Sequence, residues 1–541
     1  MFNTEKWKNR PNKFAGSCAG CSQWVISQAG LLGGEPGGWL TVCTQCATGE
    51  AAPEAVAEKT YPLTEEQEHV LDLFKTGESI AVQAGAGTGK TTTLMAIANS
   101  TTRKGQYIAF NTDIVTAAQL KLPRNVQATT AHSLAMSGTS KVYAPRLGSN
   151  RMKSHEIAKW LGIKAFSWSF AGESHTLAPG ALAGYVYLAI KKFCNSADSA
   201  PLASKHMESI NGLDKEGSHV RRDRLHAILQ PFIDAAWSDL VNPAGVLPFN
   251  HDHYLKIWAL GDAKIPGDFM LFDEAQDASP VMVDVVKRQG KQVVWVGDSM
   301  QGIYEWRGAV DALATVGAEH TAYLTHSFRF GQGIADVANL ILDTIASAKL
   351  RLVGRGGESS TGFARKPDAI ICRTNAGAMG SVLQARADGH KAVLVGKNDD
   401  IAAFVRAAIK LQDGRKVEHF ELACFASWAE VEEYAENDPN GADLAKWVNL
   451  FTKFSPEQVL DAVTSTTKIE DADVVVTTTH KSKGLEWNTV QLCGDFPYND
   501  PDKGKTLNDS DKKLLYVAAT RAMKHLDFED CTAIADLVYG R

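Results

Sequence analysis

The sequence contains no uninterrupted apolar run of the ~18 residues that a membrane-crossing helix needs. The longest candidate, ALAGYVYLAI at 181–190, stops at Lys191 and Lys192. The N-terminal segment MFNTEKWKNR is polar and lacks the apolar core of a secretory signal. These absences argue against a membrane span and against secretion. We therefore expect a protein of the cytoplasm (of a bacterium or of a virus-infected host cell) or of the nucleus.

The chain also lacks an excess of positive charge, because 56 Lys and Arg residues face 62 Asp and Glu residues for a formal net charge of −6. A protein that bound nucleic acid by electrostatics alone would be basic overall, so any nucleic acid must be held in a local groove. The hydrophobic content of 44% is ordinary for a globular protein. A length of 541 residues predicts about three to five domains.

Cysteine is scarce, with nine residues, and four of them form two pairs near the start. The other five are scattered singly, mostly inside apolar runs: Cys194, Cys372, Cys424, Cys493 and Cys531. Isolated cysteines in such runs are typical of small buried hydrophobic residues in a reducing compartment. We expect no structural disulfides among these five.

The two early pairs are Cys18-x-x-Cys21 and Cys43-x-x-Cys46. Two such knuckles brought together make a tetrahedral four-sulfur site, which suits zinc. The alternative is two disulfides, which the lack of a secretory signal disfavours. The spacing predicts a zinc-ribbon-like domain at 1–50. Such a ribbon can bind nucleic acid, bind a protein partner or cap a domain, and the sequence leaves these roles open.

A glycine-rich stretch, QAGAGTGKTT at 83–92, follows a short apolar strand and opens a helical pattern. This context predicts a phosphate-binding loop, whose backbone N–H groups converge on phosphate oxygens. Lys90 would reach the β- and γ-phosphates of ATP, and the hydroxyl of Thr91 would bind Mg²⁺. The strict pattern has glycine where this chain has Ala84. The nucleotide-binding candidates of the loop are Ala84, Gly85, Ala86, Gly87, Thr88, Gly89, Lys90, Thr91 and Thr92.

A second motif, FMLFDEAQD at 269–277, is an apolar strand that ends in acidic residues. Asp273 would hold Mg²⁺, and Glu274 would polarise the attacking water as a general base. Alone such a pair is weak evidence, but together with Lys90 and Thr91 it is strong. These strands are nearly continuous apolar runs, which are typical of parallel strands covered by helices on both faces. The sequence therefore predicts an α/β fold.

Further motifs follow in a fixed order: YPLTEEQ (61–67), YIAFNTDIVTAA (107–118), TTAHSLA (129–135), VGDSMQGIYEWRGA (296–309), YLTHSFRF (323–330), VVVTTTHKSKGLEWNTV (474–490) and KLLYVAATRA (513–522). The series resembles the UvrD/Rep-like superfamily 1A DNA helicases over roughly residues 60–530. It is most similar to the branch that includes the F-box DNA helicases, with the zinc ribbon here in place of the F-box.

The resemblance implies two RecA-like parallel-sheet P-loop NTPase domains with helical insertions. The expected division is a zinc-ribbon-like domain at 1–50, motor domain 1A at 59–150 and 261–319, helical insertion 1B at 151–260, motor domain 2A at 320–396 and 472–541, and a reduced accessory insertion 2B at 397–471. The last segment is much shorter than the accessory domain of well-known relatives. The chain also departs from the family pattern at Thr92, where the family often has arginine.

The resemblance also implies roles around ATP. Gln67 would read the adenine edge, Phe328 would stack on adenine, and Glu486 would lie near the ribose. By the same resemblance, further contacts to the γ-phosphate come from Gln301, Arg329 and Arg521, of which Arg521 is the arginine-finger candidate.

Six side chains are implied to contact single-stranded DNA: Phe110, Asn111, His132, Tyr304, Trp306 and His480. The aromatic ones would stack on bases without regard to sequence. A basic cluster, HVRRDR at 219–224, would meet duplex DNA or form a solvated helix face, and the sequence favours neither.

The expected function is an ATP-dependent DNA helicase that translocates on single-stranded DNA, 3′→5′ by family analogy, and acts at single-strand/duplex junctions in DNA repair, recombination or replication. Its cofactors would be ATP, Mg²⁺ and Zn²⁺. The alternative is a DNA-stimulated ATPase that displaces proteins without productive unwinding. A non-catalytic scaffold is a third interpretation, which the lysine, acidic residues and arginines named above disfavour.

Overall fold

The structure is a computed structural model. It describes four short strands before residue 44 and then residues 62–540, except 110, 140, 148–151, 171–172, 208–218, 305–307, 397, 418, 420, 424, 438–440, 466–467 and 500–505. The chain forms two compact units, Met1–Thr64 and Glu65–Arg541. Within the described residues, no helix combines the length and the apolar character needed to cross a membrane.

The first unit contains two antiparallel strand pairs. β1 (Gly16–Ser17) pairs with β2 (Trp24–Val25), and β3 (Gly30–Gly33) pairs with β4 (Leu40–Cys43). Cys43 is the last residue of β4. Cys18, Cys21 and Cys46 lie outside the described residues. The zinc site therefore stays a prediction.

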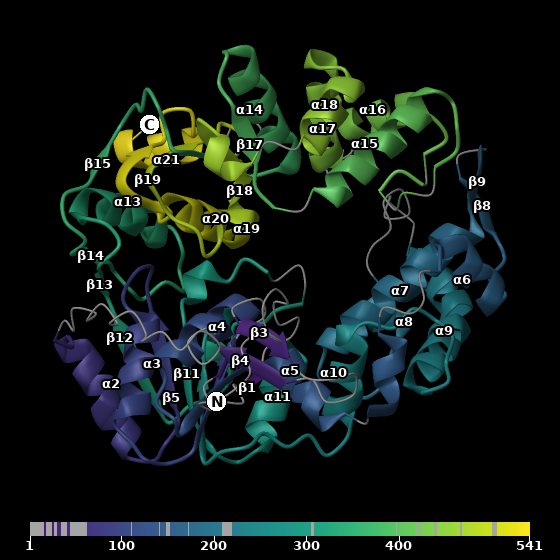
Figure 1. The fold of residues 1–541 in the computed structure, drawn as a ribbon. Coiled ribbons are helices and arrows are strands. Elements are labelled where there is room, and N and C mark those ends of the chain that lie inside the picture. Colours follow the sequence, from purple (N-terminus) through teal and green to yellow (C-terminus); the bar gives the residue numbers. More distant parts are fainter. Residues whose placement is uncertain are drawn as a thin grey trace. The chain divides into compact units, whose positions relative to one another are not determined.

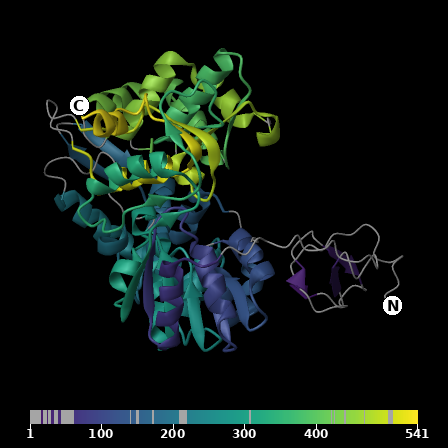
Figure 2. The same ribbon diagram turned by 90° about the vertical axis from the view of Figure 1, so that its left-hand side faces the viewer.

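The second unit is α/β and contains two six-stranded sheets, drawn in purple to teal and in green to yellow (Figures 1 and 2). The first sheet has the strand order β12-β5-β11-β10-β6-β7, with every pair parallel. Its strands are β5 (Ile80–Ala84), β6 (Gly105–Ala109), β7 (Val126–Thr130), β10 (Phe269–Phe272), β11 (Gln292–Gly297) and β12 (His320–Leu324).

Both faces of this sheet are buried, which explains the continuous apolar runs. Alternate residues along β10 belong to different cores: Leu271 packs with the helices of one face, and Met270 with those of the other. The first face carries α2 (Glu65–Lys75), α3 (Lys90–Asn99) and α4 (Thr112–Lys121). The opposite core draws on α5 (Ala131–Gly138), α11 (Pro280–Arg288) and α12 (Ala312–Thr315).

One expected boundary differs from the structure. The sequence placed the start of the second motor domain at residue 320, but β12 pairs with β5 along its whole length. Ala322 and Leu324 point into the core of the first sheet, because they alternate with the exposed Thr321 and Tyr323. The first sheet therefore continues to Leu324.

The segment inserted after the first strands is mostly helical, as the sequence predicts. It contains α6 (Ser154–Leu161), α7 (Pro179–Asn195), α8 (Ala203–His206), α9 (His219–Val241) and α10 (His251–Leu260). It also contains an antiparallel pair, β8 (Phe166–Phe170) with β9 (Glu173–Leu177), which the sequence interpretation did not predict. The alternation in FSWSF is the period-two signal that was available. The buried side chains of the β8–β9 pair belong to the core that covers one face of the first sheet.

The second sheet has the order β15-β20-β19-β16-β18-β17 and is also parallel throughout. Its strands are β15 (Ser360–Thr361), β16 (Ala369–Cys372), β17 (Ala392–Leu394), β18 (Val474–Thr478), β19 (Trp487–Leu492) and β20 (Ala522–Asp527). One core joins it to α13 (Gln332–Asp343), α20 (Asp509–Ala519) and α21 (Thr532–Tyr539). A second core joins it to α14 (Asn375–Ala387), α15 (Asp399–Gln412), α16 (Trp428–Asn437), α17 (Ala442–Lys453) and α18 (Pro456–Thr464).

Candidate nucleotide and nucleic-acid site

The predicted phosphate loop lies between β5 and α3. Gly87 and Gly89 have φ angles of 74° and 82°, a left-handed conformation that favours glycine. Lys90 begins the helix, and its Nζ lies 3.5 Å from the carbonyl oxygen of Ala84. Thr91 is exposed in the first turn. A helix N-terminus preceded by such a loop is suited to bind an anion.

The two predicted acidic residues follow β10. The carboxylate of Asp273 accepts a hydrogen bond from the Tyr107 hydroxyl at 2.5 Å. Glu274 is the only non-glycine residue with a positive φ in the described part of the chain, at 53°. Backbone conformations of this kind cost free energy and often occur at functional sites. Asp273, Lys90 and the hydroxyl of Thr91 form a donor set that fits a magnesium-bound triphosphate.

Burial and neighbouring charge act differently on these two carboxylates. Burial raises the pKa of Asp273, and repulsion from Glu274 adds to the rise. Burial also opposes ionisation of Glu274, but the cationic side chains of Lys90, Lys483 and Arg521 and a hydrogen bond from Gln276 together outweigh it. The pKa of Glu274 therefore lies below its usual range. Glu274 is thus held ionised, the state that a general base requires.

Two of the predicted γ-phosphate residues, Gln301 and Arg521, are hydrogen-bonded to each other. Nη2 of Arg521 donates to Oε1 of Gln301 at 3.3 Å, and Nε2 of Gln301 donates to Asp298 at 2.7 Å. Arg521 is only 1% exposed, and burial together with repulsion from Arg329 lowers its pKa to about 9. Arg329 itself donates from Nε to Glu486 at 2.7 Å.

The phosphate loop contacts residues that follow the first sheet in the sequence, which we call the second half of the unit. The N–H of Phe328 donates to the carbonyl oxygen of Gly87 at 2.9 Å. A Cβ added at Gly87 would lie 2.6 Å from Cβ of Arg329, so only glycine allows this approach. A Cβ at Gly89 would lie 2.9 Å from Nε2 of Gln67. The structure therefore brings the predicted nucleotide residues of both halves beside one loop.

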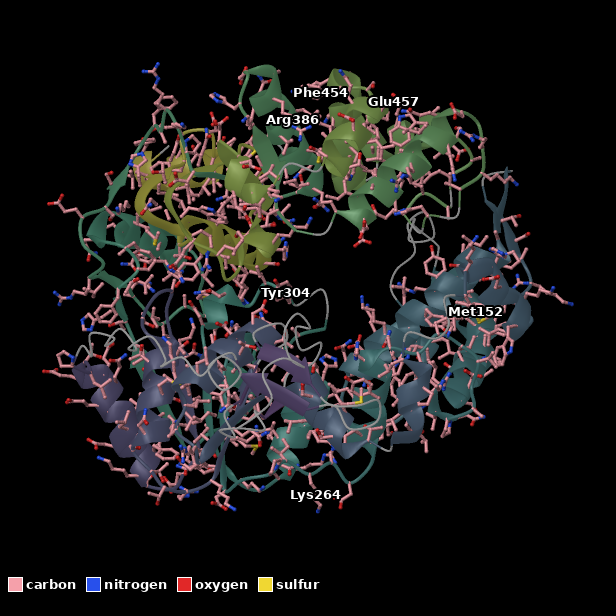
Figure 3. The ribbon with its side chains drawn as sticks, in the orientation of Figure 1. Met152, Lys264, Tyr304, Arg386, Phe454 and Glu457 are labelled. Carbon is pink, nitrogen blue, oxygen red and sulfur yellow. The ribbon has the colours of Figure 1, made fainter. Side chains whose placement is uncertain are left out.

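Of the predicted DNA contacts, Tyr304 and His480 lie together. The Tyr304 hydroxyl donates to the carbonyl oxygen of His480 at 3.0 Å, and the ring of Tyr304 is labelled in Figure 3. Nε2 of His480 lies 3.1 Å from the carbonyl oxygen of Ile303. Phe110 and Trp306 lie outside the described residues.

Two other DNA candidates have contacts elsewhere. The side chain of Asn111 accepts a hydrogen bond from the N–H of Ile114 and caps α4. His132 pairs with Asp252 at 3.1 Å, and this hydrogen bond lowers the pKa of Asp252. The exposed basic cluster at the start of α9 includes Arg222 and Arg224.

The sequence interpretation missed several residues of the group around the loop. The Tyr516 hydroxyl accepts from the N–H of Ala86 at 3.2 Å and donates to Asp298 at 3.0 Å. Asp277 and Lys483 form a buried ion pair nearby. All of these residues lie inside motifs quoted in the sequence analysis. No local sequence pattern, however, distinguishes a residue that contacts the loop from one that packs in the core.

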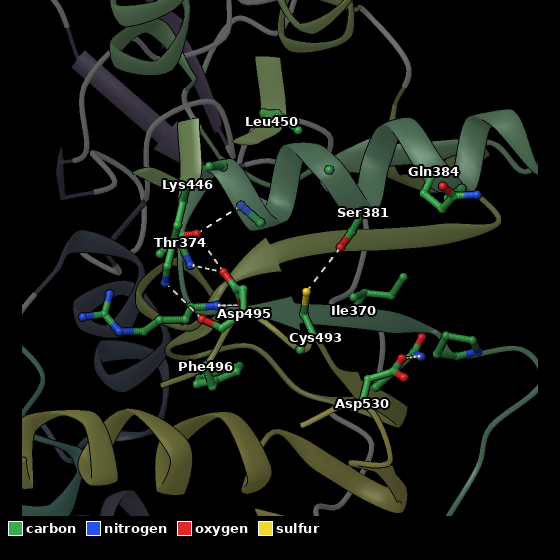
Figure 4. A pocket seen from close by; sticks show the side chains of 18 of the residues that line it. Ile370, Thr374, Ser381, Gln384, Lys446, Leu450, Cys493, Asp495, Phe496 and Asp530 are labelled. Atoms are coloured by element: carbon green, nitrogen blue, oxygen red, sulfur yellow. Dashed lines mark hydrogen bonds between the residues drawn. The ribbon is translucent and has the colours of Figure 1, made fainter. Parts of the chain in front are cut away.

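A separate pocket of about 1630 Å³ lies beside α14 and α17 of the second sheet (Figure 4). Cys372, Cys493 and Asp495 place two thiols and a carboxylate within 4.8 Å of one another there. The carboxylate oxygens of Asp495 already accept hydrogen bonds from the N–H groups of Arg373 and Thr374 and from the Thr374 hydroxyl. Among the single cysteines that the structure describes, Cys194, Cys372 and Cys531 are buried and Cys493 is half-buried, and all four are free thiols.

Two family models match the chain. One, described as an AAA domain, covers residues 67–307, and the other, the UvrD-like helicase C-terminal domain, covers 385–531. The first therefore spans the phosphate loop and the acidic motif. The second spans the segment that holds Lys483, Tyr516 and Arg521.

Several curated proteins are similar in sequence. F-box DNA helicase protein 1 of Schizosaccharomyces pombe is 29% identical over 91% of this chain and 60% of its own length. F-box DNA helicase 1 of Gallus gallus is 28% identical over 86% of this chain and 48% of its own. A probable DNA helicase of Mycoplasma pneumoniae is 28% identical over 48% of this chain and 42% of its own. The chain spans about half to three-fifths of the length of the two F-box relatives. The chain is therefore similar to the F-box DNA helicases over most of its own length, and its residues 385–531 match the UvrD-like helicase C-terminal domain.

Proposed function

We propose that this protein is an ATP-dependent DNA helicase that moves along single-stranded DNA in the 3′→5′ direction. The observation that carries the proposal is the contact between the phosphate loop and the second half of the unit. The carbonyl oxygen of Gly87 accepts a hydrogen bond from the N–H of Phe328, and the N–H of Ala86 donates one to the Tyr516 hydroxyl. A triphosphate at this loop would therefore touch groups from both halves, as a nucleotide-driven motor requires.

Each predicted residue has a role in this proposal. Lys90 holds the phosphates, and Glu274 accepts the proton of the attacking water. Arg329 and Arg521 balance the charge that develops on the transferred phosphoryl group. Gln301 links Arg521 to the segment that carries Tyr304. Thr91 and Asp273 would hold Mg²⁺, which would neutralise phosphate charge when bound.

Three of the remaining nucleotide assignments are supported by position. Gln67 lies beside Gly89, Phe328 is 52% exposed next to the loop, and Glu486 pairs with Arg329. Tyr304 and His480 form the proposed strand contact, together with Phe110, Asn111, His132 and Trp306. ATP binding favours one arrangement of the two halves, and hydrolysis removes the bridge between them, so each cycle shifts the grip on the strand.

The test compares unwinding of duplexes that carry a 3′ or a 5′ single-stranded tail. We expect ATP-dependent strand release from the 3′-tailed duplex alone, and none from either substrate with Lys90→Ala. Release from the 5′-tailed duplex would reverse the proposed direction. Absence of both unwinding and DNA-stimulated ATP hydrolysis would overturn the proposal.

A second candidate function is displacement of bound proteins without unwinding. The short accessory region favours it, since α15 to α18 occupy only the segment 399–464. Release of streptavidin from a 5′-biotinylated single strand measures displacement directly, because a motor that moves 3′→5′ runs towards that end. Displacement at the wild-type rate without strand separation would select this alternative.

We further propose that the first unit binds one zinc ion through Cys18, Cys21, Cys43 and Cys46 and offers a surface to a protein partner. The antiparallel pair β3–β4, which ends at Cys43, is consistent with a ribbon. Zinc content measured by mass spectrometry should be one per chain. It should fall to zero in a variant with Cys43→Ser and Cys46→Ser.

A further inference from the structure

Two cysteines lie opposite one another at the ends of neighbouring strands of the second sheet. β16 and β19 run parallel, and Ile371 is paired with Leu492. Cys372 and Cys493 are the next residues along the chain, and the N–H of Cys493 donates to the carbonyl oxygen of Ile371 at 2.9 Å. Both are free thiols. Neither has a role in the proposed helicase function.

The two cysteine side chains lie on the same face of the sheet. Ile371 and Leu492 belong to the core that contains α13, α20 and α21. Cys372 and Cys493 pack into the other core, on the side of α14, as the alternation of side chains along a strand requires. Their sulfurs lie within 4.8 Å of one another. Adjacent strands are about 4.8 Å apart, and a disulfide spans Cα separations of about 4.4–6.8 Å, so the backbone already suits a bond between them.

One hydroxyl of α14 contacts both sulfurs. Oγ of Ser381 lies 3.4 Å from Sγ of Cys372 and 3.6 Å from Sγ of Cys493, and Figure 4 shows Ser381 directed at Cys493. A hydroxyl can accept from a thiol and donate to a thiolate. Ser381 therefore serves the pair in either protonation state.

The two thiols differ in access and in acidity. Cys372 is 0% exposed, and burial raises the pKa of its thiol. Cys493 is half-buried and lines the pocket beside α14 and α17. A hydrogen bond from the Cys372 thiol lowers the pKa of Cys493, against the opposing effects of burial and of the Asp495 carboxylate. An accessible thiol of lowered pKa beside a buried one is the arrangement in which the first reacts with an oxidant and the second resolves the product.

We propose that Cys372 and Cys493 form a dithiol site for hydroperoxides, in which Cys493 is attacked first and Cys372 resolves the product as a reversible disulfide. The thiolate of Cys493 bonds to one peroxide oxygen, the O–O bond breaks, and the other oxygen leaves and takes a proton from water. The sulfur of Cys372 then bonds to the sulfenic sulfur, the S–O bond breaks, and the thiol proton leaves with that oxygen as water. The two thiols lose two electrons, which the peroxide gains.

The test is peptide mapping by mass spectrometry of the full chain, after treatment with hydrogen peroxide and alkylation of the remaining thiols. We expect a peptide pair linked through Cys372 and Cys493, which dithiothreitol separates again. Cys531→Ala is the matched control, because Cys531 is also a buried free thiol but belongs to the core on the opposite face of the sheet. That variant should form the linked pair to the same extent as the wild type.

Single variants test the order of the two steps. In Cys372→Ala, dimedone should label Cys493 as a sulfenic acid, because the resolving thiol is gone. In Cys493→Ala, Cys372 should stay unmodified under the same treatment, because it is buried. Full alkylation of both cysteines in the peroxide-treated wild type, or a link from Cys493 to Cys531 instead, would overturn the inference. Oxidation of Cys372 at the wild-type rate in Cys493→Ala would also contradict it.

Discussion

Each parallel sheet has an interior strand that leads through a short loop into a helix, and the two junctions differ in what satisfies the helix N-terminus. At the β5–α3 junction the N-cap is Gly89, which makes no side-chain hydrogen bond to the helix. At the β16–α14 junction the N-cap is Thr374, whose hydroxyl accepts from the N–H of Gly377. The free N–H groups of a helix start need acceptors, and the two junctions supply them differently.

The second junction uses a carboxylate of the chain itself. Asp495 accepts from the N–H groups of Arg373 and Thr374, and a Cβ at Gly377 would lie 2.1 Å from its Oδ2 (Figure 4). An internal anion thus lies where a helix N-terminus favours negative charge. The comparison teaches that two similar strand–helix junctions can differ in function: the first is suited to an external phosphate, whereas the second is already neutralised.

The largest expected effect is at the first junction. Lys90→Ala should lower ATP turnover by about 10³-fold, because an electrostatic contact to the transferred phosphoryl group is lost. Phosphate release at saturating oligo(dT) measures it. Lys446→Ala is the control at the second junction, where Nζ donates to the carbonyl oxygen of Asp495 at 3.1 Å. It should retain wild-type turnover, and an equal loss would show that both junctions serve catalysis.

An arginine exchange should have the next largest effect. Arg521→Lys should lower turnover by about 10²-fold, since lysine cannot reproduce the guanidinium contacts to Gln301 and Leu485. Arg373→Lys is the matched change at the second junction, where Nε lies 3.5 Å from the carboxylate of Asp511. We expect no change in turnover from it. Comparable rates for the two variants would remove the distinction between the junctions.

Removing the internal anion should affect stability and leave chemistry intact. Asp495→Ala should lower the free energy of unfolding by about 1–3 kcal/mol, because the N–H groups of Arg373 and Thr374 lose their acceptor. Urea unfolding followed by circular dichroism measures this loss. Asp530→Ala, which removes an exposed carboxylate near the same pocket, is the control. Full stability of Asp495→Ala would mean that the carboxylate is not needed there.

The smallest expected effect is at the cap of α14. Thr374→Ala should cost about 1 kcal/mol of stability, because the hydroxyl both caps the helix and donates to Asp495. Thr374→Ser retains the hydroxyl and should stay close to the wild type. Melting temperatures of the three proteins test the order. An alanine variant as stable as the serine variant would contradict the capping role.

The local structure of the first junction could be predicted from sequence because its signals are contiguous. Two of the loop glycines, Gly87 and Gly89, are where the backbone has positive φ, and Lys90 begins the helix as expected. The acidic motif likewise follows a buried strand. These features depend on residues within a few positions of one another, which is the range over which sequence patterns are informative.

The second junction could not be predicted in the same way. Asp495 is 122 positions from Arg373, and Lys483 is 206 positions from Asp277. Such pairs depend on how the sheets fold, and no local pattern identifies the partner. The β8–β9 pair was missed for a different reason, because two short strands stand inside a segment whose overall pattern is helical.

The hydroxyl of Tyr516 has a consequence for nucleotide affinity. It accepts the N–H of Ala86, one of the loop donors on which a phosphate oxygen would draw. An incoming phosphate would therefore compete with a side chain of the protein for that donor. The observed dissociation constant would equal the intrinsic one divided by the fraction of molecules in which the tyrosine is disengaged. Tyr516 would thus raise the nucleotide concentration that half-saturates the loop.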